Sequence, residues 1–323
     1  MHIAIVGAGI AGLSAAQRLL DAGHSIDIFE KSRGLGGRLH TRRGELASVD
    51  LGAQYFTARD PRFIRQCEQW QQAGLVAEWP VTPWRLQGNR LYASPDDTRR
   101  LVGTPTMNAA LRSPPTEMVV HRHTRIVALD HHDHQWHLES ESGAFVAADA
   151  VIVATPAAQA RPLIASSTKL NNALNQVSME PCWAVALVFE TATGIAPDAA
   201  FAEDHPVSWL ARNSSKPGRN GKPETWVLHA STSWTLEHLE APPEQVGEML
   251  AHWFNTTLKP AGAPLQVQAH RWRFARTSSR LAAADCIDLE HRIALCGDWC
   301  AGGRVEGAWL SGQDIAEQLF RNF

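Results

Sequence analysis

The sequence has 323 residues, which is too long for one ordinary hydrophobic core and fits two domains. A hydrophobic content of 44%, a charged content of 20% and a net charge of −3 are typical of soluble globular proteins and give no sign of wholesale nucleic-acid or membrane binding. No stretch reaches the ~18 apolar residues that a membrane span needs. Five scattered cysteines are not a disulfide framework, so we expect a reduced, cytoplasmic setting.

The first thirty residues predict a dinucleotide-binding unit. Ile3–Val6 is typical of a buried parallel strand, GAGIAG follows at 7–12, and residues 13–20 have helical spacing. Ser25–Phe29 is a second strand, and it ends on Glu30. Strand, glycine turn, helix, strand and acid in this order are the signature of a βαβ nucleotide site.

Each residue type in this unit has a physical role. Gly7 permits the tight turn, Gly9 lets the backbone approach a pyrophosphate, and Gly12 lets helix and strand pack closely. The helix N-terminus offers free N–H groups and a partial positive charge to phosphates, and Glu30 can accept hydrogen bonds from ribose hydroxyls.

The middle of the chain predicts mixed elements. We expect a helix from about Pro61 to Gly74, strands within 81–94, a hairpin of Val119–Leu129 with Gln135–Ser140, and a buried strand at Val151–Ala154. The histidines of HHDHQWH (131–137) lie at the hairpin tip, where polar residues are expected, and the Cys296 and Cys300 spacing fits no usual zinc pair. We therefore expect no metal site.

Residues 180–275 predict a mostly antiparallel block. PCWAVALVFE, TWVLHASTSW and LQVQAHRWRFA are expected strands, and Pro242–Leu258 is an expected helix. SSKPGRNGKPE, rich in Gly, Pro and Lys, predicts an exposed loop.

The C-terminal part predicts a second half of the nucleotide site. A buried strand at Ile293–Cys296 leads to Gly297-Asp298, then to Gly302-Gly303, and the segment Val305–Ala308 begins a long helix. A dinucleotide unit at one end and a Gly-Asp strand end at the other predict a long ligand held by both ends of the chain.

Together these motifs resemble FAD-dependent oxidoreductases of the flavin amine oxidase superfamily, and within it the bacterial renalase-like proteins. The residues that carry the resemblance are GAGIAG, Glu30, GLGGR (34–38), DLGAQYF (50–56) and GDW…GGRVEGAWLSG (297–312), with VLHAS and HRWRFA for the narrower group.

The resemblance implies a set of FAD contacts. Gly7, Gly9, Ile10, Ala11 and Gly12 would hold the pyrophosphate, Glu30 the adenosine ribose, and Lys31, Gly37 and Arg38 the diphosphate and adenosine region. Ile126 would bind adenine through its backbone, Gln54 and Tyr55 would approach the isoalloxazine ring, and Asp298 would bind the ribityl chain or a phosphate. Val305, Glu306, Gly307 and Ala308 would place a helix N-terminus against flavin N1 and O2.

One departure from the family pattern concerns lysine. Many amine oxidases hold a lysine-bound water beside flavin N5, and the lysine comes from a substrate-domain strand. None of Lys31, Lys169, Lys216, Lys222 and Lys259 lies in a convincing strand of that kind. In family members with covalent FAD, the linking cysteine follows the glycine pair. Here Cys300 precedes that pair, so non-covalent FAD is expected.

The resemblance implies oxidation of misreduced NAD(P)H isomers, the 2- and 6-dihydro forms, to NAD(P)⁺, with hydride passing to flavin N5 and O₂ reduced to H₂O₂. A dihydropyridine is already a hydride donor, so no essential acid or base is expected; the enzyme needs a slot that aligns the ring. The predicted slot residues are Gln54, Tyr55, His229, Trp234, Trp272, Arg273 and Trp299. Strand alternation puts Arg271 and Arg273 on one face and Trp272 and Phe274 on the other.

Two alternatives remain at this point. An amine oxidase acting on a small primary or secondary amine predicts flavin reduction by simple amines, and a non-catalytic flavoprotein predicts bound FAD that no small donor reduces quickly.

The expected fold is α/β: a doubly wound, Rossmann-like FAD domain (1–55, 98–155 and 282–323) with an inserted antiparallel-sheet substrate domain (56–97 and 156–281). This is the architecture of amine oxidases and p-hydroxybenzoate hydroxylase, with the active site between the domains.

Overall fold

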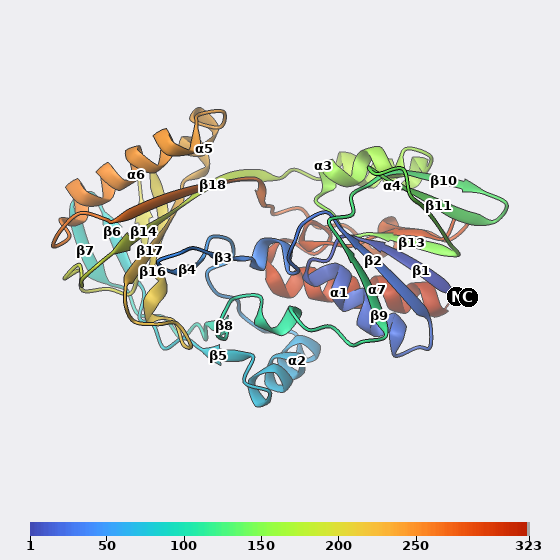
Figure 1. Cartoon of the computed structure of the whole chain (residues 1–323), viewed down its shortest axis with the longest axis horizontal. Coiled ribbons are helices and arrows are strands. Elements are labelled where there is room, and N and C mark those ends of the chain that lie inside the picture. Colours follow the sequence, from blue (N-terminus) through green and yellow to red (C-terminus); the bar gives the residue numbers. More distant parts are fainter. Residues whose placement is uncertain (322–323) are drawn as a thin grey trace.

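The computed structural model describes residues 1–321, and most of its strands belong to two sheets at opposite ends of the molecule (Figure 1). The first sheet has the order β19-β20-β13-β1-β2-β9, and its pairs are parallel except for β19 with β20. Its strands are β1 (His2–Val6), β2 (Ser25–Glu30), β9 (Met118–Arg122), β13 (Ala150–Val153), β19 (Ile287–Asp288) and β20 (Ile293–Leu295). The expected doubly wound sheet is confirmed.

Two helices from opposite ends of the chain pack together beside this sheet. They are α1 (Ile10–Leu20) and α7 (Arg304–Arg321), which run next to each other in Figure 1. A Cβ on Gly312 of α7 would lie 2.2 Å from the carbonyl oxygen of Ala11, so glycine is needed for this close approach. The Ser14 hydroxyl donates to the Trp309 carbonyl at 2.8 Å across the same contact.

The second sheet is mostly antiparallel and has the order β18-β14-β17-β16-β15-β6-β7. Only β15 and β6 pair in parallel. Figure 1 shows α5 (Thr232–Glu237) and α6 (Pro243–Leu258) covering one face. Its strands are β6 (Trp84–Gln87), β7 (Arg90–Ala93), β14 (Glu180–Phe189), β15 (Ala199–Glu203), β16 (Val207–Arg212), β17 (Glu224–Ala230) and β18 (Gln266–Arg276).

A short hairpin connects the two parts of the molecule. Strands β3 (Thr41–Arg43) and β4 (Ser48–Asp50) extend toward the seven-stranded sheet (Figure 1). Val49 and Leu51 are buried there in a small cluster with the alanines and valine of β14 and β17. The hairpin therefore carries the chain from the nucleotide-binding turns directly to the second sheet.

The remaining elements are short. The small strands are β5 (Val76–Glu78) with β8 (Leu101–Gly103), and β10 (Ile126–His132), β11 (Gln135–Ser140) and β12 (Phe145–Ala148). The other α-helices are α2 (Pro61–Gln72), α3 (Ala157–Ala160) and α4 (Thr168–Asn175). Short 3₁₀ helices are η1 (Gly37–Leu39), η2 (Ala109–Leu111), η3 (Arg161–Ile164), η4 (Asn213–Ser215), η5 (Ala283–Cys286) and η6 (Asp298–Cys300).

Several predicted elements differ in the structure. The single strand expected at Val119–Leu129 is two strands, because His123 takes a φ of 55° and turns the chain, so that β9 joins the parallel sheet and only β10 forms the hairpin with β11. The end of TWVLHASTSW is helical, since the Ser231 side chain caps α5 at the Trp234 N–H. Strands β15 and β16 were not predicted.

Helix α2 lies with the six-stranded sheet, although its residues fall in the range expected for the substrate domain. Phe63 packs on Trp309 of α7 with ring centroids 5.4 Å apart, and Arg62 pairs with Asp314 at 2.5 Å. The domain boundaries given above stay a prediction.

Candidate active site

A cavity of about 2570 Å³ lies between the two sheets. Its lining comes from the β1–α1 turn, the end of β2, residues 34–43, residues 51–55, β18 and the C-terminal segment around η6. Ligand pockets usually measure about 300–1,000 Å³, so this cavity has room for more than one ligand of ordinary size.

The first turn forms an open cradle. Gly7 has a φ of +111°, which favours glycine, and a Cβ on Gly12 would lie 2.1 Å from the Gly7 carbonyl oxygen. A Cβ on Gly9 would meet nothing within 4 Å, and no side chain caps the N-terminus of α1. Gly9, Ile10 and Ala11 line the cavity, so uncapped N–H groups and free space fit a bound diphosphate.

The acid at the end of β2 borders the same space. Glu30 accepts hydrogen bonds from the N–H groups of Ala8, at 2.9 Å, and Ser32, at 2.7 Å, which fix its carboxylate at the cavity edge. Lys31 and Ile126 also line the cavity, and the Lys31 ammonium donates to Gln159 at 2.9 Å. This arrangement fits the predicted adenosine region.

An ion pair joins the two ends of the chain at the cavity. Arg38 donates to both carboxylate oxygens of Asp298, at 2.8 and 2.5 Å, and to the Ala275 carbonyl at 3.1 Å. The GLGGR segment (34–38) and the Gly297-Asp298 strand end are therefore in direct contact. The Arg38 guanidinium is therefore already paired with Asp298 in this structure.

The cavity wall at residues 50–54 is held by the second sheet. His229 of β17 donates from Nε2 to the Leu51 carbonyl at 3.3 Å, and Trp272 of β18 donates from Nε1 to the same oxygen at 2.9 Å. Gln54 donates to the carbonyls of Asp50 and Gly52. A Cβ on Gly52 would lie 1.9 Å from the Arg38 carbonyl oxygen.

His229 lines the cavity as a neutral ring. Burial, together with the positive charges of Arg276 and Lys216, lowers its pKa to about 4, although the hydrogen bond to the Leu51 carbonyl raises it. Its partner is a carbonyl oxygen, so Nε2 carries the proton and Nδ1 is free to accept. At neutral pH His229 can therefore form hydrogen bonds to a ligand, but it does not offer it a positive charge.

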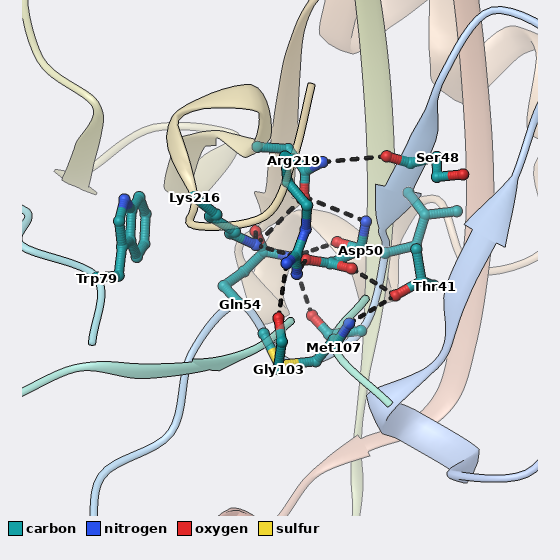
Figure 2. A network of polar contacts seen from close by, with 12 residues as sticks. Thr41, Ser48, Asp50, Gln54, Trp79, Gly103, Met107, Lys216 and Arg219 are labelled. Atoms are coloured by element: carbon teal, nitrogen blue, oxygen red, sulfur yellow. Dashed lines mark hydrogen bonds and ion pairs between the residues drawn. The ribbon is translucent and has the colours of Figure 1, made fainter. Parts of the chain in front are cut away.

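A buried ion cluster lies behind the same wall (Figure 2). Asp50 Oδ2 accepts from the Lys216 ammonium at 3.1 Å and from the Arg219 guanidinium at 2.7 Å, while Oδ1 accepts from the Thr41 hydroxyl at 2.5 Å. Lys216 also donates to Gln54 Oε1 at 3.2 Å. The loop that contains Lys216 was expected to be exposed, and this is wrong for Lys216, because the short helix η4 turns its side chain inward.

Opposing effects set the pKa values in this cluster. Burial lowers the pKa of Lys216 to about 8 despite the Asp50 charge, which raises it. Burial raises the pKa of Asp50, but the charges of Lys216 and Arg219 outweigh it and hold that pKa below its usual value. The carboxylate is therefore ionised at neutral pH.

Aromatic side chains form another part of the wall. Tyr55 packs on Trp209 with ring centroids 5.5 Å apart, and Phe201 packs on Trp209 at 4.7 Å. All of them line the cavity, as do Trp272 and Trp299. Phe201 and Trp209 were missed because β15 and β16 were not recognised. The available signal was short, the apolar–polar–apolar alternation of Val207, Ser208 and Trp209.

Two predicted substrate residues have other partners. Arg273 borders the cavity, but its guanidinium donates to both oxygens of Glu240 at 2.7 Å, and Arg271 shares the same carboxylate. The predicted alternation holds, and the Trp272 face is the one turned to the wall. Trp234 stacks on His238 with centroids 4.1 Å apart and is not among the residues that line the cavity.

Some predicted cofactor residues lie outside the cavity lining. The first turn of α7 borders it through Val305 and Ala308, as expected, whereas Gly12, Glu306 and Gly307 are not in the lining. The Glu306 carboxylate accepts the N–H groups of Arg59, at 2.6 Å, and Asp60, at 2.7 Å, just before α2. Gly307 allows a close approach to Ala301.

The described residues contain no group of three or more His, Cys, Asp or Glu side chains that could hold a metal ion. The thiols of Cys296 and Cys300 are buried, and burial raises the pKa of each well above its usual value, so both are poor nucleophiles. Across residues 1–321, no helix is both long and apolar enough to cross a membrane.

Two family models match the chain. A "NAD(P)-binding Rossmann-like domain" matches residues 5–70, and "Flavin containing amine oxidoreductase" matches residues 88–320. Renalase from Mus musculus is 20% identical, and the alignment covers 99% of each chain. A 4,4'-diapophytoene desaturase from Staphylococcus aureus (strain Newman) is 42% identical over 52 residues, which cover 16% of this chain and 10% of the relative.

Solved structures share the fold over the whole chain. A putative protoporphyrinogen oxidase from Exiguobacterium sp. 255-15 has a TM-score of 0.82 at 12% identity, covering 98% of both chains. Putrescine oxidase bound to putrescine has a TM-score of 0.74 at 14% identity, covering 99% of both chains. Cyclohexylamine oxidase from Brevibacterium oxydans IH-35A has a TM-score of 0.72 at 14% identity, covering 99% of this chain and 98% of that one.

The family model for flavin-containing amine oxidoreductases covers most of the chain, and the cradle, the Arg38–Asp298 contact and the large cavity fit its cofactor. The predicted cofactor and reaction class are confirmed. The chain belongs to the family of flavin-containing amine oxidoreductases and is an FAD-dependent oxidoreductase.

Proposed function

We propose that this enzyme oxidises misreduced isomers of NAD(P)H, the 2- and 6-dihydro forms, to NAD(P)⁺, and that O₂ is the final acceptor and yields H₂O₂. The observation that carries this proposal is the charge of the cavity. Among the described residues that line it, the carboxylates are Glu30 and Asp298, and both are already engaged by backbone N–H groups or by Arg38.

Cationic side chains are far more numerous in the same lining. They occur at the nucleotide cradle and also on the β3 hairpin and β18, at the other end of the cavity. The set is Lys31, Arg33, Arg38, Arg42, Arg43, Arg112, Arg122, Arg125, Arg271, Arg273, Arg276 and Arg304. Arg38, Arg125, Arg271 and Arg273 pair with carboxylates, but the remaining cations still exceed what the two phosphates of FAD require. This excess favours a second anionic ligand over a protonated amine.

The wall residues suit a flat ring that already carries a transferable hydride. Tyr55, Phe201 and Trp209 offer aromatic faces, and the neutral His229 offers a hydrogen-bonding nitrogen. When bound, FAD would supply the hydride acceptor and the route by which the electrons reach O₂. The protein then has to orient the dihydropyridine and exclude water. Neither role needs a strong base, because the dihydropyridine is already a hydride donor.

The other predicted substrate residues keep supporting roles in this proposal. Trp272 and Gln54 hold the wall, Trp299 lines the cavity next to Asp298, and Arg273 contributes to the charge at its border. We further propose that FAD is held without a covalent bond, because Cys300 is buried and absent from the described lining.

Anaerobic stopped-flow absorbance tests this function. The yellow holoprotein is mixed with purified 2- and 6-dihydroNAD(P), with ordinary 4-dihydroNAD(P)H, and with putrescine and benzylamine. We expect fast bleaching of the flavin band by a 2- or 6-isomer only. Fast bleaching by an amine alone would establish amine oxidation instead, and no bleaching by any donor would also refute the proposal.

A further inference from the structure

The buried ion cluster behind the cavity wall does not itself line the cavity, but all three of its charged side chains are buried and hydrogen-bonded. The side chains of Lys216 and Asp50 are 0% exposed, and that of Arg219 is 5% exposed. The three ammonium protons of Lys216 meet three acceptors, on Asp50 at 3.1 Å, Gln54 at 3.2 Å and Asn213 at 3.3 Å (Figure 2). A protonated lysine is thus fully satisfied.

The charges of this cluster do not cancel. Asp50 Oδ2 is shared by both cations, and its other oxygen accepts from a neutral hydroxyl. In the part of the chain that the structure describes, no second carboxylate bonds to Lys216 or Arg219. Two cations with one anion leave a net positive charge in a site closed to water, where charges are poorly screened.

Gln54 connects this charge to the cavity. Its Nε2 donates to the carbonyls of Asp50 and Gly52, so Oε1 is turned toward Lys216, which can only donate. Gln54 itself lines the cavity, whereas Lys216 and Asp50 do not. The Lys216 ammonium is therefore separated from the cavity by the Gln54 side chain alone, and it fixes the orientation of the Gln54 amide.

We propose that Lys216, Asp50 and Arg219 form a buried electrostatic device that makes bound FAD easier to reduce, and that Lys216 is also the positioning residue for Gln54. Reduction by two electrons leaves negative charge on the flavin ring, which a fixed positive charge behind the wall stabilises. The proposal needs the ring beside Gln54 and Tyr55, as the family resemblance implies, and it holds for any electron donor.

The test is the midpoint potential of FAD in the holoprotein, measured by dye equilibration without substrate. Lys216→Met and, separately, Arg219→Gln each bring the cluster to zero net charge, and we expect a more negative potential in both. Lys216→Arg should keep the wild-type value. The matched control is Lys222→Met, which removes an exposed lysine of the same loop and should leave the potential unchanged.

A double variant separates charge from lost contacts. Asp50→Asn with Lys216→Met loses more hydrogen bonds than either single change, but Arg219 restores one net positive charge. We expect its potential to return toward that of the wild type. A potential in Lys216→Met and Arg219→Gln equal to that of the wild type, or a double variant at least as negative as Lys216→Met, would overturn the proposal. Because no substrate is used, this outcome is independent of the stopped-flow result.

Discussion

The Leu51 carbonyl is the acceptor through which two strands of the second sheet hold the cavity wall. Both His229 and Trp272 donate to it. A charged His229 could still donate from Nε2, but its second N–H would need a partner in a partly closed space, and burial lowers the pKa to about 4. The neutral ring is thus a structural requirement of the wall.

This gives a stability prediction with a defined sign. Between pH 6.5 and pH 4 the unfolded chain binds a proton at His229 that the folded protein excludes, so the free energy of unfolding falls as the pH is lowered through this window. The residue is half-buried, so we expect a loss of about 1 kcal/mol.

Urea unfolding at pH 7 and at pH 5 tests this. The free energy of unfolding should differ less between the two pH values for His229→Gln than for the wild type. His252→Gln, at an exposed position on α6, is the control and should match the wild type.

Gly52 permits a second close contact in the same wall. The Ala53 N–H donates to the Arg38 carbonyl at 2.9 Å, and a Cβ on Gly52 would lie 1.9 Å from that oxygen. Gly52→Ala should therefore lower stability by about 1–3 kcal/mol and weaken FAD binding, since Arg38 must shift. Thermal unfolding and fluorescence titration of the apoprotein with FAD measure both. Gly221→Ala, where a Cβ meets nothing within 4 Å, should change neither, and wild-type values for Gly52→Ala would contradict the prediction.

At the scale of elements, α7 holds the segment that leads into α2, whose own N-cap is Asp60. The Glu306 carboxylate accepts the N–H groups of Arg59 and Asp60, which precede the first turn of α2. Glu306→Ala leaves both donors without this partner, and we expect a loss of about 1–2 kcal/mol in the free energy of unfolding. Chemical unfolding followed by circular dichroism tests this. Glu306→Gln retains one acceptor oxygen and should lose less; equal losses would show that charge, not acceptance, is what matters.

The elements also show what sequence reasoning can and cannot reach. The turn at Gly7–Gly12 was predictable because glycine spacing, strand and helix signals are all local. Lys216 was not, because nothing in a loop rich in Gly, Pro and Lys indicates that one lysine meets an aspartate 166 residues earlier in the chain. Trp209 was missed with its strand, and the contacts of the Glu306 side chain were not predictable because its partners lie in a distant segment.

At the scale of the whole molecule, charge is distributed unevenly. The chain has a net charge of −3, but among the charged side chains that line its cavity, cations far outnumber carboxylates. Salt screens such fields over about 8–10 Å at physiological strength, so attraction of an anionic dinucleotide should weaken as salt increases.

We therefore expect kcat/KM for the 2- and 6-dihydro dinucleotides to fall several-fold between ~0.05 and ~0.5 M NaCl, mainly through KM. The neutral dihydronicotinamide riboside is the matched comparison and should show little dependence on salt. A kcat/KM for the dinucleotides that is flat or rises with salt would argue against recognition by these cations. Steady-state oxygen consumption is sufficient for the measurement.

The bidentate pair between Arg38 and Asp298 also bears on how the protein is made. These residues are 260 positions apart, and β20, the innermost C-terminal strand, docks on β13 only after almost the entire chain has been synthesised. On the ribosome the glycine cradle emerges early but lacks half of its walls. Cofactor binding is therefore a late event in biosynthesis, and a nascent chain that stops before residue 293 has an incomplete cofactor-binding site.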